Sequence, residues 1–377
     1  MRVCDLTTLF IDGGQGGVNT YLHEKARFLT RHGHAHTVIV PGAEDSTRRL
    51  FGSTVHTLRS RPLPSNPAHR VLARFREVRK LLRAFAPDVV EVDCAYLLGQ
   101  VASKVLPADV PVVGFYHVHL PTFIARPRFS RFGPLAGAAE RFTWRYVDYC
   151  YRHVDRLVVT SHDMEARLAA AGFERLEHIP LGVNLDLFQP NGRDARDPER
   201  PVELLSVGRL SREKDLPTLF DAFSLLPADY RLTVVGDGPL RNVLEERAAR
   251  DPRVRMLGPL PYGSELAKIY AGADMLVVPS PNETFNLTVL EGFASGLPVV
   301  AARQGGPLHL VPGELGELAT PGDPMDFARK IQSLAARRVP SSTCRALAVS
   351  RYSWEGTFER LVGLYERARS EKASLRR

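Results

Sequence analysis

Residues 2–29, RVCDLTTLFIDGGQGGVNTYLHEKARFL, contain the parts of a βα unit in order. Residues 3–10 form an apolar run typical of a buried strand, and the glycines of residues 13–17 follow as a turn. Apolar residues then recur at helical spacing until Gly33. Similar strand and helix patterns alternate to about residue 160. This alternation is typical of a parallel, doubly wound sheet, so the sequence predicts an α/β fold.

A polar segment divides the chain into two halves. Residues 189–201, QPNGRDARDPERP, lack apolar periodicity and have the composition of an interdomain linker. The strand and helix alternation restarts at Glu203 and continues to Ala301. We therefore predict two Rossmann-like doubly wound domains, residues 1–188 and 200–355. Because open parallel sheets bind ligands at the carboxyl ends of their strands, we expect the two domains to face each other across a cleft.

The composition excludes several classes of protein. The chain has no run of about 18 apolar residues that could span a bilayer, and its start lacks the apolar core of a signal peptide, so we expect a cytoplasmic protein. Its four cysteines lie far apart without a Cys-x-x-Cys pair, which favours neither a disulfide framework nor a structural zinc site. No Asp-x-Asp metal motif is evident, and we expect no metal and no cofactor.

The net charge of +8 raises the question of an anionic partner, and six of these charges lie in residues 1–188. A nucleic-acid-binding protein would concentrate them with stacking aromatic residues, which only residues 126–132 partly do, so no nucleic-acid partner is expected. Residues 69–85 are predicted to form a helix with a basic face. That face could rest on anionic lipid headgroups or simply be solvated.

Two motifs could bind phosphate groups. The glycine turn before the first helix would let backbone N–H groups approach an anion, although it could also be merely a tight turn; it does not match the dinucleotide fingerprint. In the second half, Arg209 and Lys214 follow a predicted strand at residues 203–207. The two cations could converge on a diphosphate, or form a solvated surface pair.

A third motif, PSPNETFNLTVLEG at residues 279–292, places two glutamates eight residues apart around a predicted helix start. Glu283 precedes that helix and Glu291 lies within it, so both could face a ligand at the strand ends, while the first amides of the helix meet an anion. Alternatively, Glu283 caps the helix and Glu291 is an ordinary surface charge.

These motifs together resemble the family 4 retaining glycosyltransferases of GT-B fold. The resemblance rests on the 279–292 motif, on ASGLPVV at 294–300, on VGRL at 207–210 with Lys214, and on GDGP at 236–239. It extends over most of the chain, which is similar to bacterial lipid or polysaccharide mannosyl-, glucosyl- or sulfoquinovosyl-transferases. The context of residues 114–121 is similar to that of some lipid-modifying members. As in related proteins, the last helix is expected to cross back, which assigns residues 356–377 to the first domain.

The resemblance implies a nucleotide-sugar donor site. Arg209 and Lys214 would bind the diphosphate, and Glu283 would contact the transferred sugar. The other donor-binding residues implied by the resemblance are Gly16, Gly17, Leu260, Pro261, Thr284, Phe285, Asn286, Leu287 and Glu291, the last holding the ribose. The sequence departs from the family pattern at Asn286 and Gly292, where Gly and Ala are more frequent, and at Glu91, where His is common.

The acceptor side is less defined. His117 matches the family's active-site histidine, and His119 is a weaker candidate for the acceptor region. Arg126 and Arg128 interleave with phenylalanines just after this motif, which suggests a loop for an acceptor or a membrane surface. The expected acceptor is a lipid or glycan hydroxyl, with a soluble small molecule as the alternative. A peripheral position at an anionic membrane face would suit the basic first half.

The implied activity is that of a metal-independent, retaining hexosyltransferase. As the glycosyl bond breaks, negative charge develops on the UDP or GDP leaving group, and Arg209, Lys214 and helix amides would stabilise it. In the family, the acceptor is thought to attack on the face that the donor leaves. The rival interpretation is a nucleotide-sugar-binding protein of the same fold that has lost transfer activity, which a turnover assay would distinguish.

Overall fold

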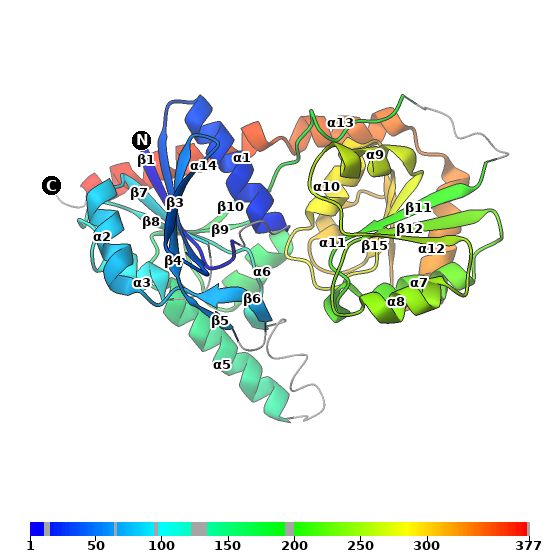
Figure 1. Ribbon diagram of the computed structural model, residues 1–377, viewed down its shortest axis with the longest axis horizontal. Coiled ribbons are helices and arrows are strands. Elements are labelled where there is room, and N and C mark those ends of the chain that lie inside the picture. Colours follow the sequence, from blue (N-terminus) through cyan, green and yellow to red (C-terminus); the bar gives the residue numbers. More distant parts are fainter. Residues whose placement is uncertain (11–15, 64–65, 94–96, 122–133, 193–199, 375–377) are drawn as a thin grey trace. The chain divides into compact units, whose positions relative to one another are not determined.

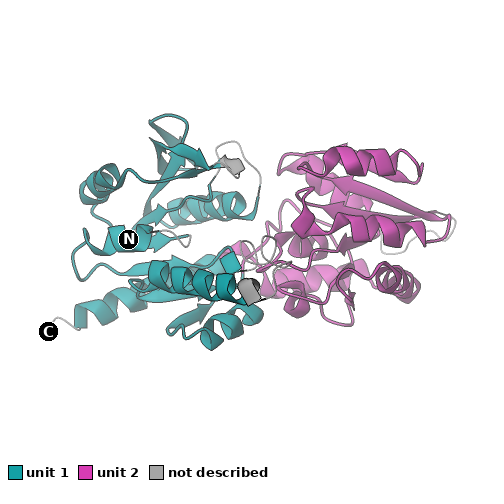
Figure 2. Cartoon of the chain, turned by 90° about the horizontal axis from the view of Figure 1, so that it is seen from below, with its two compact units in different colours: residues 1–180, 357–377 teal, residues 181–356 magenta. Residues whose placement is uncertain are grey.

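The computed structural model describes residues 1–10, 16–63, 66–93, 97–121, 134–192 and 200–374. The chain divides into two compact units, Met1–Pro180 with Thr357–Arg377, and Leu181–Gly356 (Figure 2). Each unit contains a sheet of mainly parallel strands with helices against it (Figure 1), which confirms the predicted α/β class with two domains. Residues 181–188, expected in the first domain, group with the second unit, where Arg345 donates hydrogen bonds to the carbonyls of Leu185 and Phe188.

The first unit is built on an eight-stranded sheet in the order β10-β9-β8-β7-β1-β2-β4-β3. All neighbouring strands are parallel except β3 and β4. The order reverses between β1 and β7, which makes this the ligand-binding edge expected of a doubly wound sheet. The strands are β1 (Arg2–Leu6), β2 (Ala35–Gly42), β3 (Ser46–Leu50), β4 (Ser53–Arg59), β7 (Val89–Val92), β8 (Val112–Phe115), β9 (Arg156–Val159) and β10 (Leu176–His178).

The helices of the first unit largely follow the apolar periodicity of the sequence. They are α1 (Gly17–Arg31), α2 (Phe75–Phe85), α3 (Leu98–Ser103), α5 (Pro134–Tyr151), α6 (His162–Ala170) and α14 (Trp354–Ser374), whose first residues belong to the second unit. The predicted helix at residues 69–85 is wrong in its first part, because β6 (Asn66–Val71) pairs antiparallel with β5 (Arg61–Leu63). Pairing with the neighbouring strand β5 therefore overrides the local helical pattern. No described helix is long and apolar enough to cross a membrane.

The second unit has a fully parallel six-stranded sheet in the order β13-β12-β11-β14-β15-β16. Its first strand lies in the middle, so successive βα units wind outward in both directions and the order reverses between β11 and β14. In open α/β sheets, such a reversal point is where ligands bind. The strands are β11 (Val202–Val207), β12 (Tyr230–Val235), β13 (Val254–Gly258), β14 (Met275–Val278), β15 (Val299–Ala302) and β16 (Gly316–Ala319).

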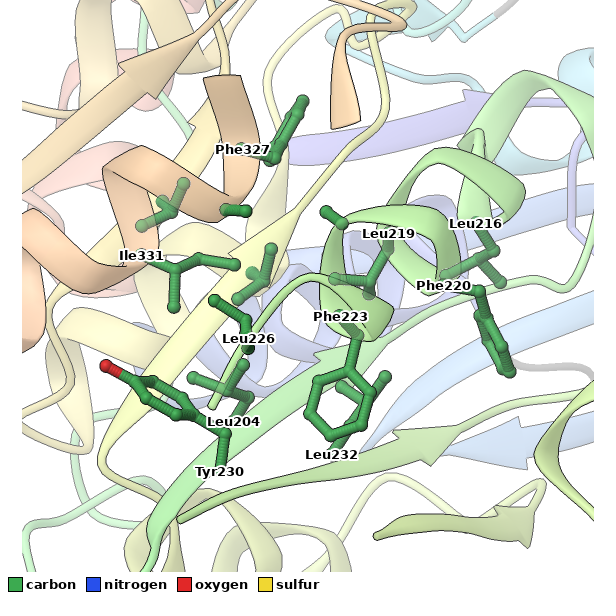
Figure 3. Packing of buried hydrophobic residues seen from close by; sticks show 14 of the residues in the cluster. Leu204, Leu216, Leu219, Phe220, Phe223, Leu226, Tyr230, Leu232, Phe327 and Ile331 are labelled. Atoms are coloured by element: carbon green, nitrogen blue, oxygen red, sulfur yellow. The ribbon is translucent and has the colours of Figure 1, made fainter. Parts of the chain in front are cut away.

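The core of the second unit lies between its sheet and helices α7 and α12. Figure 3 shows Phe223 of α7 and Ile331 of α12 over Leu204 and Leu232 of the sheet, all four essentially inaccessible to solvent. Burying each such side chain contributes about 1.5–3 kcal/mol, so this layer fixes the strand ends firmly. The helices of the unit are α7 (Leu216–Ser224), α8 (Arg241–Ala248), α9 (Ser264–Gly272), α10 (Leu287–Ala294), α11 (Pro307–Leu310), α12 (Pro324–Arg337) and α13 (Ser341–Arg351).

Candidate functional site

The residues following β11 and β14 meet at the reversal point of the second sheet. The Lys214 ammonium donates a hydrogen bond to Glu283 Oε1 at 2.6 Å, although 69 residues separate them in the chain. Arg209 is exposed, and together with Gly208 and Lys214 it lines a small hollow at the end of β11. From the sequence, the two cations were expected at the diphosphate and Glu283 at the transferred sugar, and the fold brings Lys214 into direct contact with Glu283.

The loop that carries Lys214 is held by its own turns and by the opposite loop. A single 3-10 turn, η3 (Arg212–Lys214), is followed by Asp215 in the left-handed region at φ 49°. Ser280, which follows β14, donates its hydroxyl proton to the carbonyl of Glu213 at 3.0 Å. This bond ties the two loops together, so Lys214 and Glu283 are positioned as a pair.

Two glycines after β15 support the loop that carries Glu283. The amide of Gly306 donates a hydrogen bond to the Glu283 carbonyl at 2.8 Å. A Cβ atom on Gly306 would lie only 2.0 Å from the Phe285 carbonyl oxygen, and one on Gly305 would lie 2.5 Å from that of Glu283. Since Cβ atoms essentially never approach backbone so closely, only glycine fits. This contribution was not predicted, although the Gly-Gly pair at residues 305–306 was a signal available in the sequence.

Helix α10 begins immediately after this loop. Asn286 is its N-cap residue, and its side chain accepts a hydrogen bond from the Val289 amide at 3.2 Å. The capping role considered for Glu283 is therefore wrong, and its carboxylate is available for Lys214. Asn286 adopts φ 98°, a conformation that favours glycine and that asparagine tolerates better than most residues, which explains Asn at this position. The amide of Leu287 lies in the first helical turn, where helix N-termini attract anions.

Glu291 lies inside α10 and is 7 % exposed, so it is not an ordinary surface charge. Its Oε2 accepts a hydrogen bond from the Tyr270 hydroxyl at 2.6 Å. Burial raises the pKa of Glu291 to about 7, against the lowering effect of the Tyr270 hydrogen bond. The next residue is Gly292, where a Cβ would lie 2.9 Å from Leu276 Cδ2, so an alanine there would require the Leu276 side chain to shift. Tyr270 could not be foreseen, because it occupies an apolar position of a helical pattern.

The remaining donor-site candidates of the second unit lie in two loops, the one that carries Glu283 and the one after β13. Phe285 is buried and Thr284 is half-buried, in the loop that Gly305 and Gly306 support. Leu260 is half-buried and Pro261 exposed in the loop after β13. Both residues follow the carboxyl end of β13, and the carboxyl ends of the strands of this sheet are where a ligand is expected.

In the first unit, the glycine turn leads into α1. Gly16 and Gly17 are exposed, and Gly16 has φ 146°. The preceding glycines of the turn lie outside the described residues, as do the acceptor candidates Arg126 and Arg128.

His117 lies just after β8 with its side chain almost fully enclosed. Its ring stacks on Phe115 at 4.2 Å between centroids, meets the Tyr21 ring edge-on, and has Nε2 4.0 Å from a carboxylate oxygen of Asp93. Burial lowers the pKa of His117 to about 3, so the ring is neutral near pH 7. His119 is buried too, with Nδ1 2.9 Å from the Tyr116 hydroxyl and its ring edge-on to Trp144.

A buried ionic network lies beneath His117. Lys25 Nζ donates to both Asp5 Oδ1 and Glu91 Oε1 at 2.7 Å, and all three side chains are inaccessible to solvent. Glu91 also accepts hydrogen bonds from Tyr21 of α1 and Tyr365 of α14. Burial alone would lower the pKa of Lys25, but the two carboxylates outweigh it and raise the pKa. Glu91, noted as a departure from the family pattern, thus joins α1 and α14 to β7.

The network contains the carboxylates of Asp5, Glu91 and Asp93, which approach one another within 4.8 Å and have the chemistry of a metal site. Lys25 already binds two of them and supplies a positive charge. Burial, followed by the charges of Glu91 and Asp5, raises the pKa of Asp93 well above its ordinary value and favours its protonated form. His36 Nε2 lies 3.0 Å from the other oxygen of Asp5, so the protein's own groups already contact two of the three carboxylates.

Both units match known family models. Residues 15–187 match the model described as Glycosyltransferase Family 4, and residues 201–337 match the model described as Glycosyl transferases group 1. The chain is 32 % identical over 379 residues to a GDP-mannose-dependent alpha-mannosyltransferase of Mycobacterium tuberculosis, covering 95 % of this chain and 94 % of that protein.

The chain is also similar to a plant relative and, in fold, to a solved structure. The chain is 32 % identical over 327 residues to sulfoquinovosyl transferase SQD2 of Arabidopsis thaliana, covering 82 % of this chain and 61 % of that protein. Anabaena HepE, solved in complex with UDP, superposes with a TM-score of 0.74 at 19 % identity, over 97 % of this chain and all of that one. The fold is that of the GT-B glycosyltransferases.

Proposed function

Because the chain belongs to glycosyltransferase family 4, we propose that it transfers a hexosyl group from a UDP- or GDP-sugar to a hydroxyl acceptor, with retention and without a metal ion. The observation that carries this proposal is the contact between Lys214 and Glu283, next to the N-terminus of α10 at the reversal point of a doubly wound sheet. Such an edge binds anionic nucleotides in open α/β sheets.

The geometry suggests how the charge of the reaction would be handled. Arg209 and Lys214 would stabilise the diphosphate as it leaves, and the amides at the start of α10 would add partial positive charge. Glu283 would contact the transferred sugar, while its hydrogen bond to Lys214 orients the carboxylate. The cations Arg209 and Lys214 would offset the negative charge that a divalent metal neutralises in other enzymes, which supports a metal-independent transfer.

For the first unit, we propose that His117 lies near the reacting sugar. Its ring is neutral, so it would act as a hydrogen-bond partner of sugar hydroxyls and not as a cation. The Lys25 network joins β1 and β7 to α1 and α14, and β7 pairs with β8, the strand that His117 follows. Gly16 and Gly17 would approach the donor phosphates from the start of α1.

The acceptor is proposed to be a lipid or glycan. The relatives named above are mannosyl- and sulfoquinovosyl-transferases. The first half of the chain carries most of the excess positive charge. On α5, Phe142 is 73 % exposed beside the exposed side chains of Arg141 and Arg145, a combination that suits an anionic membrane surface. A peripheral position at such a surface is part of the proposal.

A transfer assay tests the proposal. Purified full-length chain is incubated with UDP- and GDP-sugars and with either lipid extract or soluble sugars, and donor turnover is measured. Arg209→Ala and Glu283→Gln should each reduce turnover at least about 100-fold, as expected for groups that stabilise transition-state charge. Arg212→Ala provides a matched control, because Arg212 is an exposed arginine of the same loop.

The outcomes separate the alternatives. Dependence on the lipid fraction would identify a lipid acceptor, and turnover with soluble sugars alone would favour a small-molecule or glycan acceptor. Saturable nucleotide-sugar binding that Arg209→Ala weakens, without turnover on any acceptor, would favour the binding-only interpretation. Equal losses in Arg209→Ala and Arg212→Ala would contradict the proposed diphosphate site.

A further inference from the structure

Glu291 is a buried carboxylate with a protein partner on one of its two oxygens. Tyr270, from the last turn of α9, is inaccessible to solvent and donates its hydroxyl proton to Glu291 Oε2 at 2.6 Å. A hydrogen bond from a neutral donor to a buried carboxylate stabilises the ionised form and fixes the orientation of the group. With Oε2 engaged, Oε1 is the oxygen that can accept a hydrogen bond from a ligand.

The Tyr270 ring is itself held in place by the segment that opens the second unit. The Phe188 ring meets it edge-on, with centroids 5.3 Å apart and an interplanar angle of 82°. Arg345 of α13 donates hydrogen bonds to the carbonyl of Phe188 and, at 2.8 Å, to that of Ala294 at the end of α10. One guanidinium group therefore anchors both the ring that supports Tyr270 and the helix that carries Glu291.

We propose that Tyr270 is a positioning residue of the donor site, whose hydroxyl holds Glu291 ionised and turned so that Oε1 accepts hydrogen bonds from the nucleotide's ribose. This inference rests on the proposed donor-binding role of Glu291. Tyr270 belongs to a different helix from Glu291. The proposal is that Tyr270 affects nucleotide affinity only by acting on Glu291.

The electrostatics support this arrangement. Burial raises the pKa of Glu291 to about 7, and the Tyr270 hydrogen bond opposes that rise. The same burial raises the pKa of Tyr270 well above its ordinary value, so its hydroxyl keeps its proton and remains a donor. The other titratable or charged side chains on the described helices that pack beside α10 are Glu265 and Lys268 of α9, His309 of α11, and Cys344, Arg345 and Arg351 of α13. Burial and Tyr270 are the two influences that shift this pKa.

The test measures binding, so that it needs no acceptor. UDP and GDP are titrated calorimetrically into the full chain between pH 6 and pH 9. Affinity of the wild-type protein should fall as the pH drops through about 7, because Glu291 becomes protonated. In Tyr270→Phe the midpoint should rise by about one pH unit, since a bond to a charged group is lost. That shift corresponds to about five-fold weaker binding at pH 7 and nearly equal binding at pH 9.

Two controls make the readout specific. Tyr230→Phe removes a hydroxyl from another buried tyrosine of the same unit and should leave the pH profile unchanged. In the Glu291→Gln background the midpoint near pH 7 should disappear, and adding Tyr270→Phe should then change affinity equally at every pH. If Tyr270→Phe does not fold, 3-fluorotyrosine at position 270 is a stronger donor of the same shape and should move the midpoint to lower pH.

The failures are distinguishable. Glu291→Gln with wild-type affinity and pH profile would overturn the donor-binding role of Glu291, and with it the proposed site. Weakened, pH-independent binding in Glu291→Gln, together with an unmoved midpoint in Tyr270→Phe, would overturn only the role of Tyr270. A loss in Tyr270→Phe that is the same at pH 6 and pH 9 would also overturn it, because a purely structural effect has that form.

Discussion

Gly306→Ala should damage activity far more than stability, because it displaces the loop of Glu283. The added Cβ would lie 2.0 Å from the Phe285 carbonyl oxygen and 2.5 Å from its carbonyl carbon. Reaching a tolerable separation needs a shift of about 1 Å, and a misplacement of that size costs about 100-fold in rate when it affects groups that hold the substrate. Overpacking of this kind costs about 1–3 kcal/mol of stability.

The assay compares kcat/KM for the active donor with thermal unfolding of the same preparation. Each kcal/mol lowers the melting temperature of a unit this size by about 2–4 °C, so Gly306→Ala should stay folded at 25 °C. Gly313→Ala is the matched control, since no atom lies within 4 Å of a Cβ built there. If Gly306→Ala keeps kcat/KM within two-fold of Gly313→Ala, then the glycine does not position the Glu283 loop and the reasoning is refuted.

Three further substitutions probe other parts of the structure. Lys25→Met leaves two buried carboxylates without their cation, so it should lower the free energy of unfolding by about 3–5 kcal/mol in urea titrations. Lys80→Met is the control, because Lys80 is exposed, and it should change this free energy by less than about 0.5 kcal/mol. Asn286→Ala removes a helix cap whose backbone is in the left-handed region, and it should lower the free energy of unfolding by about 1–2 kcal/mol in thermal unfolding. If Asn286→Ala is no less stable than Asn286→Gly, the argument from backbone conformation is contradicted. Burial alone would raise the pKa of Asp326, but hydrogen bonds, including two from Thr320, lower it to about 2. Its stabilisation of about 2 kcal/mol is therefore present above about pH 4 and lost as the pH falls towards 2, and Asp326→Asn should remove this pH dependence from acid unfolding curves.

The order of strands and helices could largely be predicted from the sequence. The prediction succeeded where the local apolar pattern of a segment matches the burial of that segment in the fold. In the second unit, strands expected at residues 203–207 and 231–235 lie within β11 and β12, because buried parallel strands are apolar throughout and are bounded by turns. The prediction failed at residues 69–71, which belong to β6 and pair with β5, and at residues 72–74, because α2 begins only at Phe75. The two strands are neighbours in the chain, but the packing between their side chains, on which strand formation depends, is not recorded by helical periodicity.

The residues of the donor site were named from motifs, but their partners were not. Lys214 and Glu283 were both candidates, whereas the hydrogen bond between them follows from the neighbouring positions of β11 and β14. Tyr270 and Gly306 were missed because each acts on a motif residue from another element. The apolar pattern of a helix is the same whether or not the hydroxyl of a tyrosine within it is hydrogen-bonded to a carboxylate.

The sequence by itself determined the fold class, the two-domain organisation and the motif residues, since these follow from apolar periodicity, turn residues and family motifs along the chain. The tertiary structure alone decided the environment of each group. It made Glu291 a buried acid with a pKa near neutrality, made His117 a neutral ring, and compensated Glu91 with Lys25. The physical reason is that burial and hydrogen-bond partners come from strands and helices far apart in the chain, and these set the charge and orientation on which the chemistry depends.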